Sequence, residues 1–404
     1  MQLSPVYQRL LHLREVIFMN ILPIRSVIAL LTNQCNCACP YCFEARSPER
    51  MSLDTAKDIL NFVKTNAGNR SGFTFFGGEP MLEFERIIVP LVEYSEQSGV
   101  HTRFAMTTNG TLLDKERIDW LVNHDISFML SFDGNRETQE LSRPLRIKES
   151  SFDVIMNFLP YLLEKIPHQS IRATLIQENI PNFTNDVLWL DSIGVKDFSV
   201  LPNFFETWDD KTKQLFLDEL SKYNEYILSS YRNGKRPLLL RAYRAAFYEI
   251  PLVLRTKERR TSGNCITAAQ CGFGIRGGAS VDYRGDLYGC HHVPMNRQSP
   301  FYIGNVYDGI DASRIEALTA SYVPEKVGNE HCATCPIDKI CNGGCVSNNY
   351  IMCGDVHKVS EGWCFWRQSI ISAADAIMRK LADEDNALFL EEFKACLNGR
   401  AIYG

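Results

Sequence analysis

The segment Cys35-Asn36-Cys37-Ala38-Cys39-Pro40-Tyr41-Cys42 decides how the rest of this chain is interpreted. Three of its cysteines, Cys35, Cys39 and Cys42, are separated by three and then by two residues. Three thiolates in one short loop are able to ligate three irons of a four-iron, four-sulfur cluster. The loop supplies no fourth ligand, so the last iron stays open to a small molecule, as in metal sites that do chemistry. On the cysteines alone, a zinc-binding loop is the alternative.

Strand and helix signals alternate along the first half of the chain. Strands are predicted at residues 27–31, 72–76, 102–107, 126–132, 171–176 and 198–201, and helices at 53–65, 84–96, 113–122, 152–165, 183–192 and 211–231. Six βα units in succession imply a parallel sheet with right-handed crossovers. Because six units are fewer than the eight of a closed barrel, we expect an open, partial (β/α)6 barrel with the cysteine loop at the C-terminal end of its first strand.

The cysteine loop resembles the motif of the radical S-adenosylmethionine superfamily, and Tyr41 fills the aromatic place before its last cysteine. The resemblance implies that the open iron binds the amino and carboxylate groups of S-adenosylmethionine. Reduction then releases a 5′-deoxyadenosyl radical. Cys37 lies outside the motif and is interpreted as a bystander.

The second predicted strand ends in Phe76-Gly77-Gly78-Glu79-Pro80. An ordinary turn is one interpretation, because Gly-Gly and Pro suit turns. Glycines also let a ligand approach the backbone closely, and Glu79 is able to accept a hydrogen bond from an ammonium group. The segment resembles the GGEP motif of the family, which holds the methionine amino group.

Small polar residues end the third and fourth strands, and by resemblance Asn109 and Ser131 reach the ribose or carboxylate of the cofactor. Arg143 and Arg172 are candidates for a carboxylate clamp, with ordinary surface arginines as the alternative. Leu201, near the end of the sixth strand, is expected to pack on the adenine.

Eight cysteines form an ordered array in the C-terminal region: Cys265, Cys271, Cys290, Cys332, Cys335, Cys341, Cys345 and Cys364. The array resembles the SPASM extension of radical S-adenosylmethionine enzymes, which implies two auxiliary [4Fe-4S] clusters and three clusters in all. By resemblance the first takes Cys265, Cys271, Cys290 and Cys345. The second takes Cys332, Cys335, Cys341 and Cys364, with Cys353 as a competitor for Cys364. Two zinc ribbons are the alternative.

The predicted organisation follows from these patterns. Residues 1–26 form an N-terminal arm, 27–235 the partial barrel, 236–264 a linker helix, 265–365 the SPASM domain, and 366–404 closing helices. The arm is too short to be a separate peptide-recognition domain.

Composition narrows the class of protein. The chain has 404 residues, a net charge of −5 and no long basic run, which argues against nucleic acid as the main partner. No apolar run before the cysteine loop is long enough for a signal peptide or a membrane span. Fourteen cysteines without an export signal indicate metal or redox chemistry in a reducing compartment, so we expect a cytoplasmic protein without a membrane partner.

The combined patterns predict an enzyme that uses the radical to modify a ribosomally made peptide or a protein. His291 follows Cys290 where sulfatase-maturating relatives carry an aspartate base, so formylglycine formation is the second hypothesis and a zinc-holding scaffold the third. An imidazole titrates near neutral pH, so His291 is the candidate general base, with a hydrogen bond to cluster sulfur as the alternative. Expected partners are a peptide or protein substrate, an electron donor such as flavodoxin or ferredoxin, and a separate leader-recognition protein.

Overall fold

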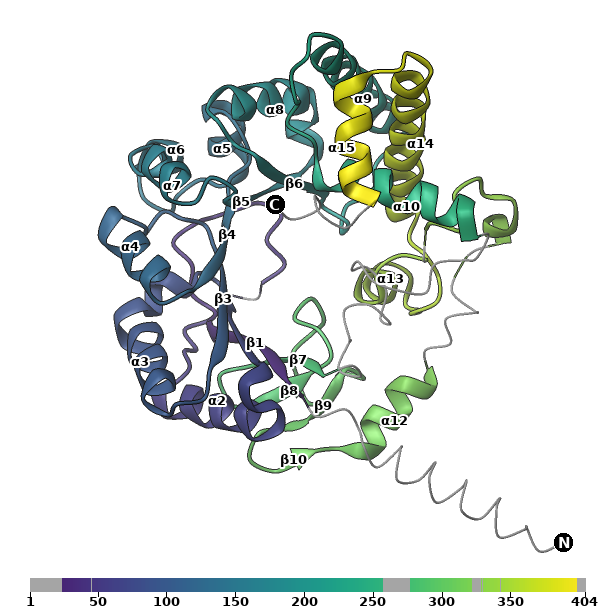
Figure 1. Ribbon diagram of the computed structural model, residues 1–404. Helices are drawn as coiled ribbons and strands as arrows, with labels where there is room; N and C mark the ends of the chain where they lie inside the picture. Colours follow the sequence, from purple (N-terminus) through teal and green to yellow (C-terminus); the bar gives the residue numbers. More distant parts are fainter. Residues whose placement is uncertain are drawn as a thin grey trace, which may run out of the picture.

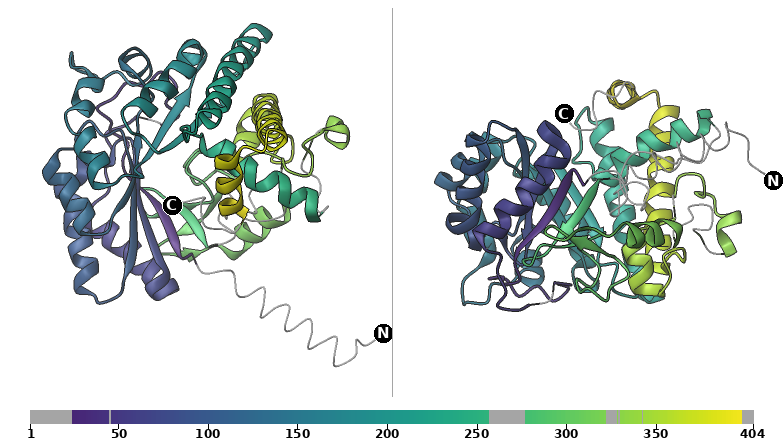
Figure 2. Two further views of the ribbon diagram at one scale, coloured as in Figure 1. Left: turned by 45° about the horizontal axis from the view of Figure 1, so that its top comes forward. Right: turned by 90° about the horizontal axis from the view of Figure 1, so that it is seen from below.

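The computed structural model describes residues 24–44, 46–256, 277–321, 328, 330–341 and 343–397 (Figure 1). Its core is a single ten-stranded sheet with the order β10-β9-β8-β7-β1-β2-β3-β4-β5-β6. The sheet is curved, and the helices that connect its parallel strands lie on its outer, convex side (Figures 1 and 2).

Six consecutive strands pair in parallel, as expected for a partial barrel. They are β1 (Ser26–Thr32), β2 (Ser71–Gly77), β3 (Thr102–Thr108), β4 (Ser127–Ser131), β5 (Ser170–Leu175) and β6 (Asp197–Pro202). In β2 and β3 burial alternates along the strand, because one face packs under the helices and the other lies on the concave side of the sheet. Parallel strands place all their C-terminal ends at one edge, where the cysteine loop begins.

The outer helices are α2 (Leu53–Ala67), α3 (Val89–Gln97), α4 (Lys115–Asn123), α5 (Arg136–Ser142), α6 (Ser151–Met156), α7 (Leu159–Lys165), α8 (Phe183–Ser192) and α9 (Asp210–Arg232). Two predicted helices are divided. The segment expected at 152–165 forms α6 and α7, with Pro160 in the first turn of α7. The segment expected at 84–96 opens with a π-helical turn, Phe84–Ile88, before Pro90 in the first turn of α3. Proline suits a first turn because it has no backbone N–H to donate. The short helix α5 was not predicted.

The cysteine-rich region extends the barrel sheet. Strand β7 (Gly278–Val281) pairs in parallel with β1, so the sheet continues through β8 (Asp286–Tyr288), β9 (Tyr302–Asn305) and β10 (Gly309–Ile310) as antiparallel hairpins. The prediction had treated this region as separate from the sheet.

The remaining helices are α10 (Arg241–Thr256), α12 (Ala312–Ser321), α13 (Val346–Cys353), α14 (Glu361–Asp383) and α15 (Ala387–Leu397). Helix α10 lies inside the predicted linker and packs on α14 and α15. One hydrophobic core runs from Ile24 in front of β1 to Phe389 in α15. None of the described helices is long and apolar enough to cross a membrane. Cys265, Cys271 and most of the predicted arm lie outside the described residues.

Candidate functional site

The cysteine loop leaves β1 and is held in place by the segment that follows α5. Ala38 N–H donates to the Pro144 carbonyl (2.8 Å), and the Arg146 amide donates to the Asn36 carbonyl (2.9 Å). The Arg146 side chain donates to the Cys35 carbonyl (3.0 Å). These contacts fix the backbone of the loop above the strand ends, whereas Cys42 stays exposed to solvent.

Cys37 lies among the ligands that the motif predicts. Its side chain is 1% exposed, and its amide donates to Cys35 Sγ at 3.4 Å. A hydrogen bond from the Cys37 side chain is the main reason that the pKa of Cys35 falls to about 6 and that the pKa of Cys39 is lowered. Hydrogen bonds to Cys35 and Cys39 raise the pKa of Cys37 itself. Cys37 therefore remains a thiol that helps its neighbours to exist as thiolates, the form that ligates metal.

The two glycines at the end of β2, Gly77 and Gly78, leave room for the backbone that enters the cysteine loop. A Cβ on Gly77, whose φ is +125°, would lie 2.3 Å from the Thr32 carbonyl oxygen. A Cβ on Gly78 would lie 2.2 Å from the carbonyl oxygen of Gln34, the residue before Cys35. The Gly78 amide donates to Thr32 (2.7 Å) and the Glu79 amide donates to Gln34 (2.9 Å). The backbone that leads from β1 into the cysteine loop therefore packs directly against both glycines.

The Glu79 carboxylate is buried, with 1% of the residue exposed. It accepts hydrogen bonds from Met81 N–H (3.0 Å), Thr108 Oγ1 (2.7 Å) and Asn109 N–H (2.8 Å). Burial raises its pKa to about 7. These bonds join the ends of β2 and β3, so the side chain positions the loops. Pro80, also buried, opens the short helical turn Pro80–Glu83 that follows.

The side chain of Asn109 also forms hydrogen bonds with the cysteine loop. Its Nδ2 donates to Asn36 Oδ1 (2.9 Å) and makes a long contact with Cys35 Sγ (3.8 Å), and its Oδ1 accepts from the Thr111 amide (2.9 Å). Ser131 ends β4, and its hydroxyl has no hydrogen-bond partner among the described residues. Of these two residues, Ser131 offers a polar group that the described protein does not use.

Arg143 makes its bidentate pair inside the protein. Its Nε and Nη2 donate to Asp133 at 2.7 and 3.2 Å, and its guanidinium lies 5.5 Å from the centre of the Tyr41 ring. Asp133 also accepts from the Thr174 amide (2.8 Å). The arginine therefore connects the motif tyrosine to the ends of β4 and β5. Arg172, in β5, is half-buried, as is Leu201 in β6.

Four of the C-terminal cysteines line one pocket. Cys332, Cys335, Cys341 and Cys364 share it with neighbours that include His331 and Gln368, and its empty volume is about 360 Å³ with open solvent included. Burial, and then the proximity of the other three thiols, raises the pKa of Cys364 to about 12. Gln368 Nε2 donates to Cys335 Sγ at 3.4 Å. Within the described residues, no group of three or more His, Cys, Asp or Glu is spaced to hold a single metal ion.

This set of four thiols is the one that the sequence assigned to the second auxiliary cluster, and a cluster of several atoms suits thiols spread around a pocket. Cys353 does not line the pocket. Cys345, assigned to the other cluster, does not line it either and caps helix α13. Its expected partners Cys265 and Cys271 lie outside the described residues.

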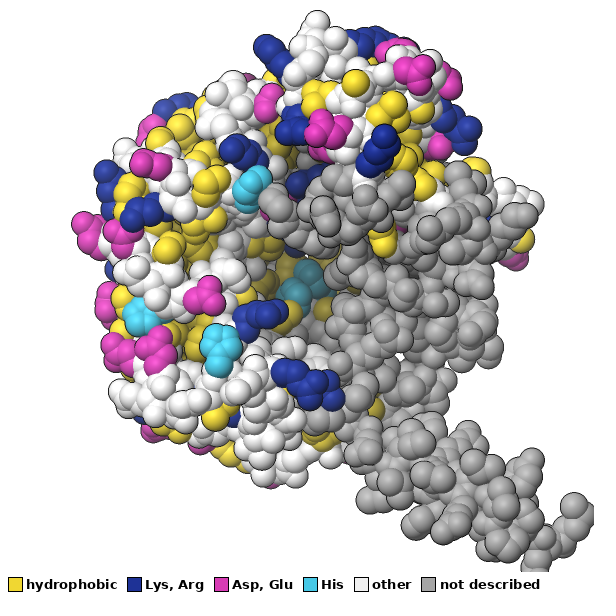
Figure 3. Space-filling model, in the orientation of Figure 1, with side chains coloured by type: hydrophobic (Ala, Val, Ile, Leu, Met, Phe, Trp, Pro, Cys, Tyr) yellow, Lys and Arg dark blue, Asp and Glu magenta, His cyan; other side chains and the backbone are white. Residues whose placement is uncertain are grey.

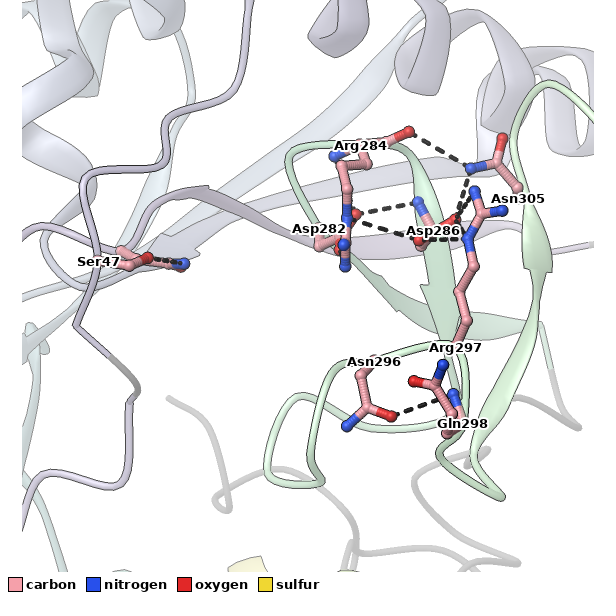
Figure 4. A network of polar contacts seen from close by, with 9 residues as sticks. Ser47, Asp282, Arg284, Asp286, Asn296, Arg297, Gln298 and Asn305 are labelled. Carbon is pink, nitrogen blue, oxygen red and sulfur yellow. Dashed lines mark hydrogen bonds and ion pairs between the residues drawn. The ribbon is translucent and has the colours of Figure 1, made fainter.

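Cys290 lies in the loop between β8 and β9, which a polar network supports (Figure 4). Asp286 is fully buried and accepts from Arg297 Nη2 (2.8 Å) and Asn305 Nδ2 (2.7 Å). Asp282 accepts from Arg284 Nε at 2.9 Å in the turn between β7 and β8. Because Arg297 belongs to the same loop as Cys290, the network fixes the loop to the extended sheet.

His291 and His292 join three phenylalanines from distant parts of the chain. The ring centre of His291 is 4.7 Å from Phe76 and 4.1 Å from His292, and His292 is 4.5 Å from Phe43. Phe205 lies 5.9 Å from Phe43. Burial, with the charge of Arg172 as a smaller cause, lowers the pKa of both histidines, that of His292 to about 4. Both imidazoles are therefore neutral near pH 7, and the sequence-predicted His291 lies on the concave side of β2.

Several residues of this region were missed by the sequence analysis. Phe43 and Phe205 belong to no motif, and only the tertiary structure brings their rings together. Glu44 follows Phe43, and its Oε1 is buried without a partner among the described residues. Asp133, which follows β4, was not singled out from the sequence. An acidic residue directly after a predicted strand was the available signal for it.

The family comparison agrees with the position of the cysteine loop. The radical SAM superfamily model matches residues 30–189, from β1 to α8. An uncharacterized protein of Methanocaldococcus jannaschii is 29% identical over 180 residues, which cover 44% of this chain and 62% of that protein. The serine-type anaerobic sulfatase-maturating enzyme of Klebsiella pneumoniae is 21% identical over 354 residues, covering 83% of this chain and 86% of that enzyme.

Solved structures show the same fold over most of the chain. The structure of anSMEcpe with bound AdoMet and Cp18Cys peptide has a TM-score of 0.70 at 18% identity, covering 89% of this chain and 99% of that one. Streptococcus suis SuiB bound to precursor peptide SuiA has a TM-score of 0.54 at 18% identity, covering 90% of this chain and 82% of the SuiB chain. Residues 30–189 therefore carry a radical SAM domain, and the chain is similar in sequence to anaerobic sulfatase-maturating enzymes and in fold to anSMEcpe and SuiB.

Proposed function

We propose that this protein is a radical S-adenosylmethionine maturase that removes a hydrogen atom from a peptide or protein substrate to install a modification. The observation that carries the proposal is the cysteine loop at the C-terminal ends of parallel strands, locked to β2 and β3 through Gly78, Glu79 and Asn109. The donor set fits in two of its three members, because hydrogen bonds lower the pKa values of Cys35 and Cys39, whereas burial raises the pKa of Cys42. A cluster held by Cys35, Cys39 and Cys42, together with S-adenosylmethionine, supplies the 5′-deoxyadenosyl radical chemistry.

The chain's own residues bind and orient in this proposal. The backbone after β2 and the Ser131 hydroxyl are positioned to receive the polar groups of S-adenosylmethionine. Glu79, Asn109 and Arg143 act as positioning residues because protein partners already occupy their polar atoms. Tyr41 and Leu201 supply the apolar contacts.

The C-terminal cysteines have a separate role in this proposal, the ligation of two auxiliary clusters. Cys332, Cys335, Cys341 and Cys364 would hold one auxiliary cluster, and Cys290 with Cys345, Cys265 and Cys271 the other. Such clusters supply electron transfer, which suits removal of an electron from a substrate radical. An external donor such as flavodoxin or ferredoxin would deliver the first electron. A separate leader-recognition protein remains part of the proposal.

The substrate class that we favour is a ribosomally made peptide. Formylglycine formation is the second candidate, favoured by the similarity to the sulfatase-maturating enzyme. His291 replaces the aspartate that the resemblance requires after Cys290, which supports the first candidate. We assign His291 the role of proton acceptor because it lies in the ring cluster on the concave side of β2.

The test uses anaerobically reconstituted protein with a reductant and S-adenosylmethionine. The wild type should contain about twelve irons per chain with matching sulfide, the content of three four-iron clusters. It should release 5′-deoxyadenosine, and Cys39→Ala should abolish that release. Cys353→Ala is the matched control, since that thiol lies outside both the loop and the cysteine pocket. Full 5′-deoxyadenosine release by the Cys39 variant would refute the assignment. A sulfatase-motif peptide, followed by mass measurement, separates the two substrate classes.

A further inference from the structure

The indole of Trp363 is buried with an unused hydrogen-bond donor. Trp363 lies in the first turn of α14, where its amide donates to the N-cap residue Ser360 (3.4 Å), and the residue is 3% exposed. Its Nε1 is buried and has no hydrogen-bond partner among the described residues. The charged side chains in Figure 3 lie at the molecular surface, where water satisfies their polar groups, but water does not reach Trp363 Nε1. Because an indole N–H can only donate, this group requires an acceptor inside the protein.

The edge of the indole that carries Nε1 faces the segment in front of α13. A Cβ on Gly344 would lie 3.3 Å from Trp363 Cδ1, the ring atom bonded to Nε1. Gly344 directly precedes Cys345, the N-cap residue of α13. Ser360 Oγ donates to Asn348 Oδ1 (2.6 Å), and this bond joins the starts of α14 and α13. The indole is therefore held against the backbone that leads into Cys345.

Cys345 supplies a sulfur that none of the described donors reaches. This half-buried residue packs against the buried pair Val359 and Trp363. Its side chain forms no cap hydrogen bond with α13, and within the described part of the chain no other hydrogen bond ends on its Sγ. Val359 lines the pocket that holds Cys364, but Trp363 does not, so the indole lies outside the wall of that pocket. A buried donor without an acceptor thus lies beside a sulfur without a donor.

Asn349 Oδ1 is a second acceptor close to the indole. It is buried and has no partner among the described residues, and a Cβ on Gly344 would lie 2.9 Å from it. The Nδ2 group of Asn349 donates to the carbonyls of Gly343 (3.1 Å) and Val356 (3.2 Å), which determines the orientation of the amide. A metal-ligating thiolate carries a negative charge and an amide oxygen does not. Since hydrogen bonds to charged acceptors are the stronger ones, the thiolate is the favoured acceptor of the two.

We infer that the Trp363 indole N–H donates to Cys345 Sγ when this sulfur is a metal-ligating thiolate. The inference rests on the proposed function, in which Cys345 ligates an auxiliary cluster. A hydrogen bond to a ligating sulfur stabilises the reduced, more negative state and so raises the reduction potential. A raised potential favours uptake of the one electron that the substrate radical loses. Trp363 thus acts through Cys345, as a positioning residue for the electron-accepting site.

The experiment compares the midpoint potentials of the auxiliary clusters in anaerobically reconstituted full-length protein, by redox titration with electron paramagnetic resonance. Trp363→Phe keeps a ring and removes the N–H. It should make the equilibrium constant for reduction of one auxiliary cluster about 3- to 10-fold smaller, which is about 30–60 mV for a one-electron couple. The shifted signal should be the one that Cys345→Ala removes. Trp366→Phe is the matched control, because Trp366 is a buried tryptophan of the same helix whose ring packs on Phe216 (5.3 Å), and its potentials should equal those of the wild type.

A second measurement needs no substitution. When the indole nitrogens of the wild type are isotope-labelled, pulsed electron paramagnetic resonance of the reduced protein should show a coupling to a labelled nitrogen, and Trp363→Phe should remove it. Absence of this coupling from the wild type, or unchanged potentials in Trp363→Phe, would overturn the inference, since the N–H would then serve Asn349 Oδ1. A shift of the signal that Cys364→Ala removes would also overturn it, because the donor would then serve the other cysteine site.

Release of 5′-deoxyadenosine with dithionite as the reductant reports on the proposed function independently. Trp363→Phe should release it at the wild-type rate in the absence of substrate. Protein that releases 5′-deoxyadenosine but contains the iron of only a single four-iron cluster would overturn this inference and leave the radical chemistry of the proposed function intact.

Discussion

Replacement of Glu79 by glutamine should change how the stability of the protein depends on pH. The carboxylate is buried and its pKa is raised to about 7, with burial as the main cause, from an ordinary value of 4.5. That difference corresponds to roughly 3 kcal/mol of free energy between the two protonation states. Because the folded-state pKa lies above the unfolded one, the stabilising contribution is fully present below pH 4.5 and is lost as the pH rises through about 7.

The glutamine variant has no such titration. Its amide nitrogen would face one of the three donors that Glu79 accepts from, which costs on the order of 1–3 kcal/mol at every pH. This constant cost cancels when the pH dependence is compared. Between pH 5 and pH 8 the wild type should therefore lose about 2.5 kcal/mol relative to Glu79→Gln, since the unfolded carboxyl is already partly ionised at pH 5.

The assay is anaerobic urea unfolding of the cluster-loaded protein without S-adenosylmethionine, at half-unit steps of pH. Glu85→Gln is the control, because Glu85 is an exposed residue of the same segment. Its free energy of unfolding, plotted against pH, should run parallel to that of the wild type. If the Glu79→Gln curve is also parallel to the wild type, the carboxylate is not held in the buried environment described here, and its assignment as a positioning residue fails.

Three further changes test other parts of the site. Gly78→Ala should lower the free energy of unfolding by roughly 1–3 kcal/mol and reduce iron retention, because its Cβ would lie 2.2 Å from the Gln34 carbonyl oxygen. Gly362→Ala is the control, since the nearest atom to its Cβ would be 3.8 Å away. Normal iron content in Gly78→Ala would contradict this packing. Burial raises the pKa of Asp186 to about 7, so the wild type should lose stability as the pH rises from about 4 to 7, and Asp186→Asn should not show this loss. If urea unfolding gives the variant and the wild type the same dependence on pH, the raised pKa is contradicted. Gln368→Leu removes the hydrogen bond to Cys335 Sγ and should lower the midpoint potential of one auxiliary cluster, measured by redox titration with electron paramagnetic resonance. Identical potentials in variant and wild type would show that this bond does not reach a cluster ligand.

The local pattern of the sequence was sufficient for most of the barrel. Helix α8 has the predicted bounds, and the six parallel strands begin and end within one residue of the predicted positions. The reason is that the alternation or run of apolar residues that marks a strand is a local property of the sequence. The two divided helices were also readable in principle, since Pro90 and Pro160 mark their interruptions.

The sequence by itself determined the chemistry of the chain: the cysteine loop, the glycine pair behind it, and a second cysteine array whose members Cys332, Cys335, Cys341 and Cys364 share a pocket. Only the tertiary structure showed which protein groups the polar residues between them contact. Glu79 and Asn109 carry the right groups for a cofactor, but whether a group faces a ligand or a neighbouring loop depends on segments about thirty to seventy residues away. The same holds for the pairing of β7 with β1 and for the contact between the rings of Phe43 and His292, because contacts between distant segments leave no periodic signal in either segment.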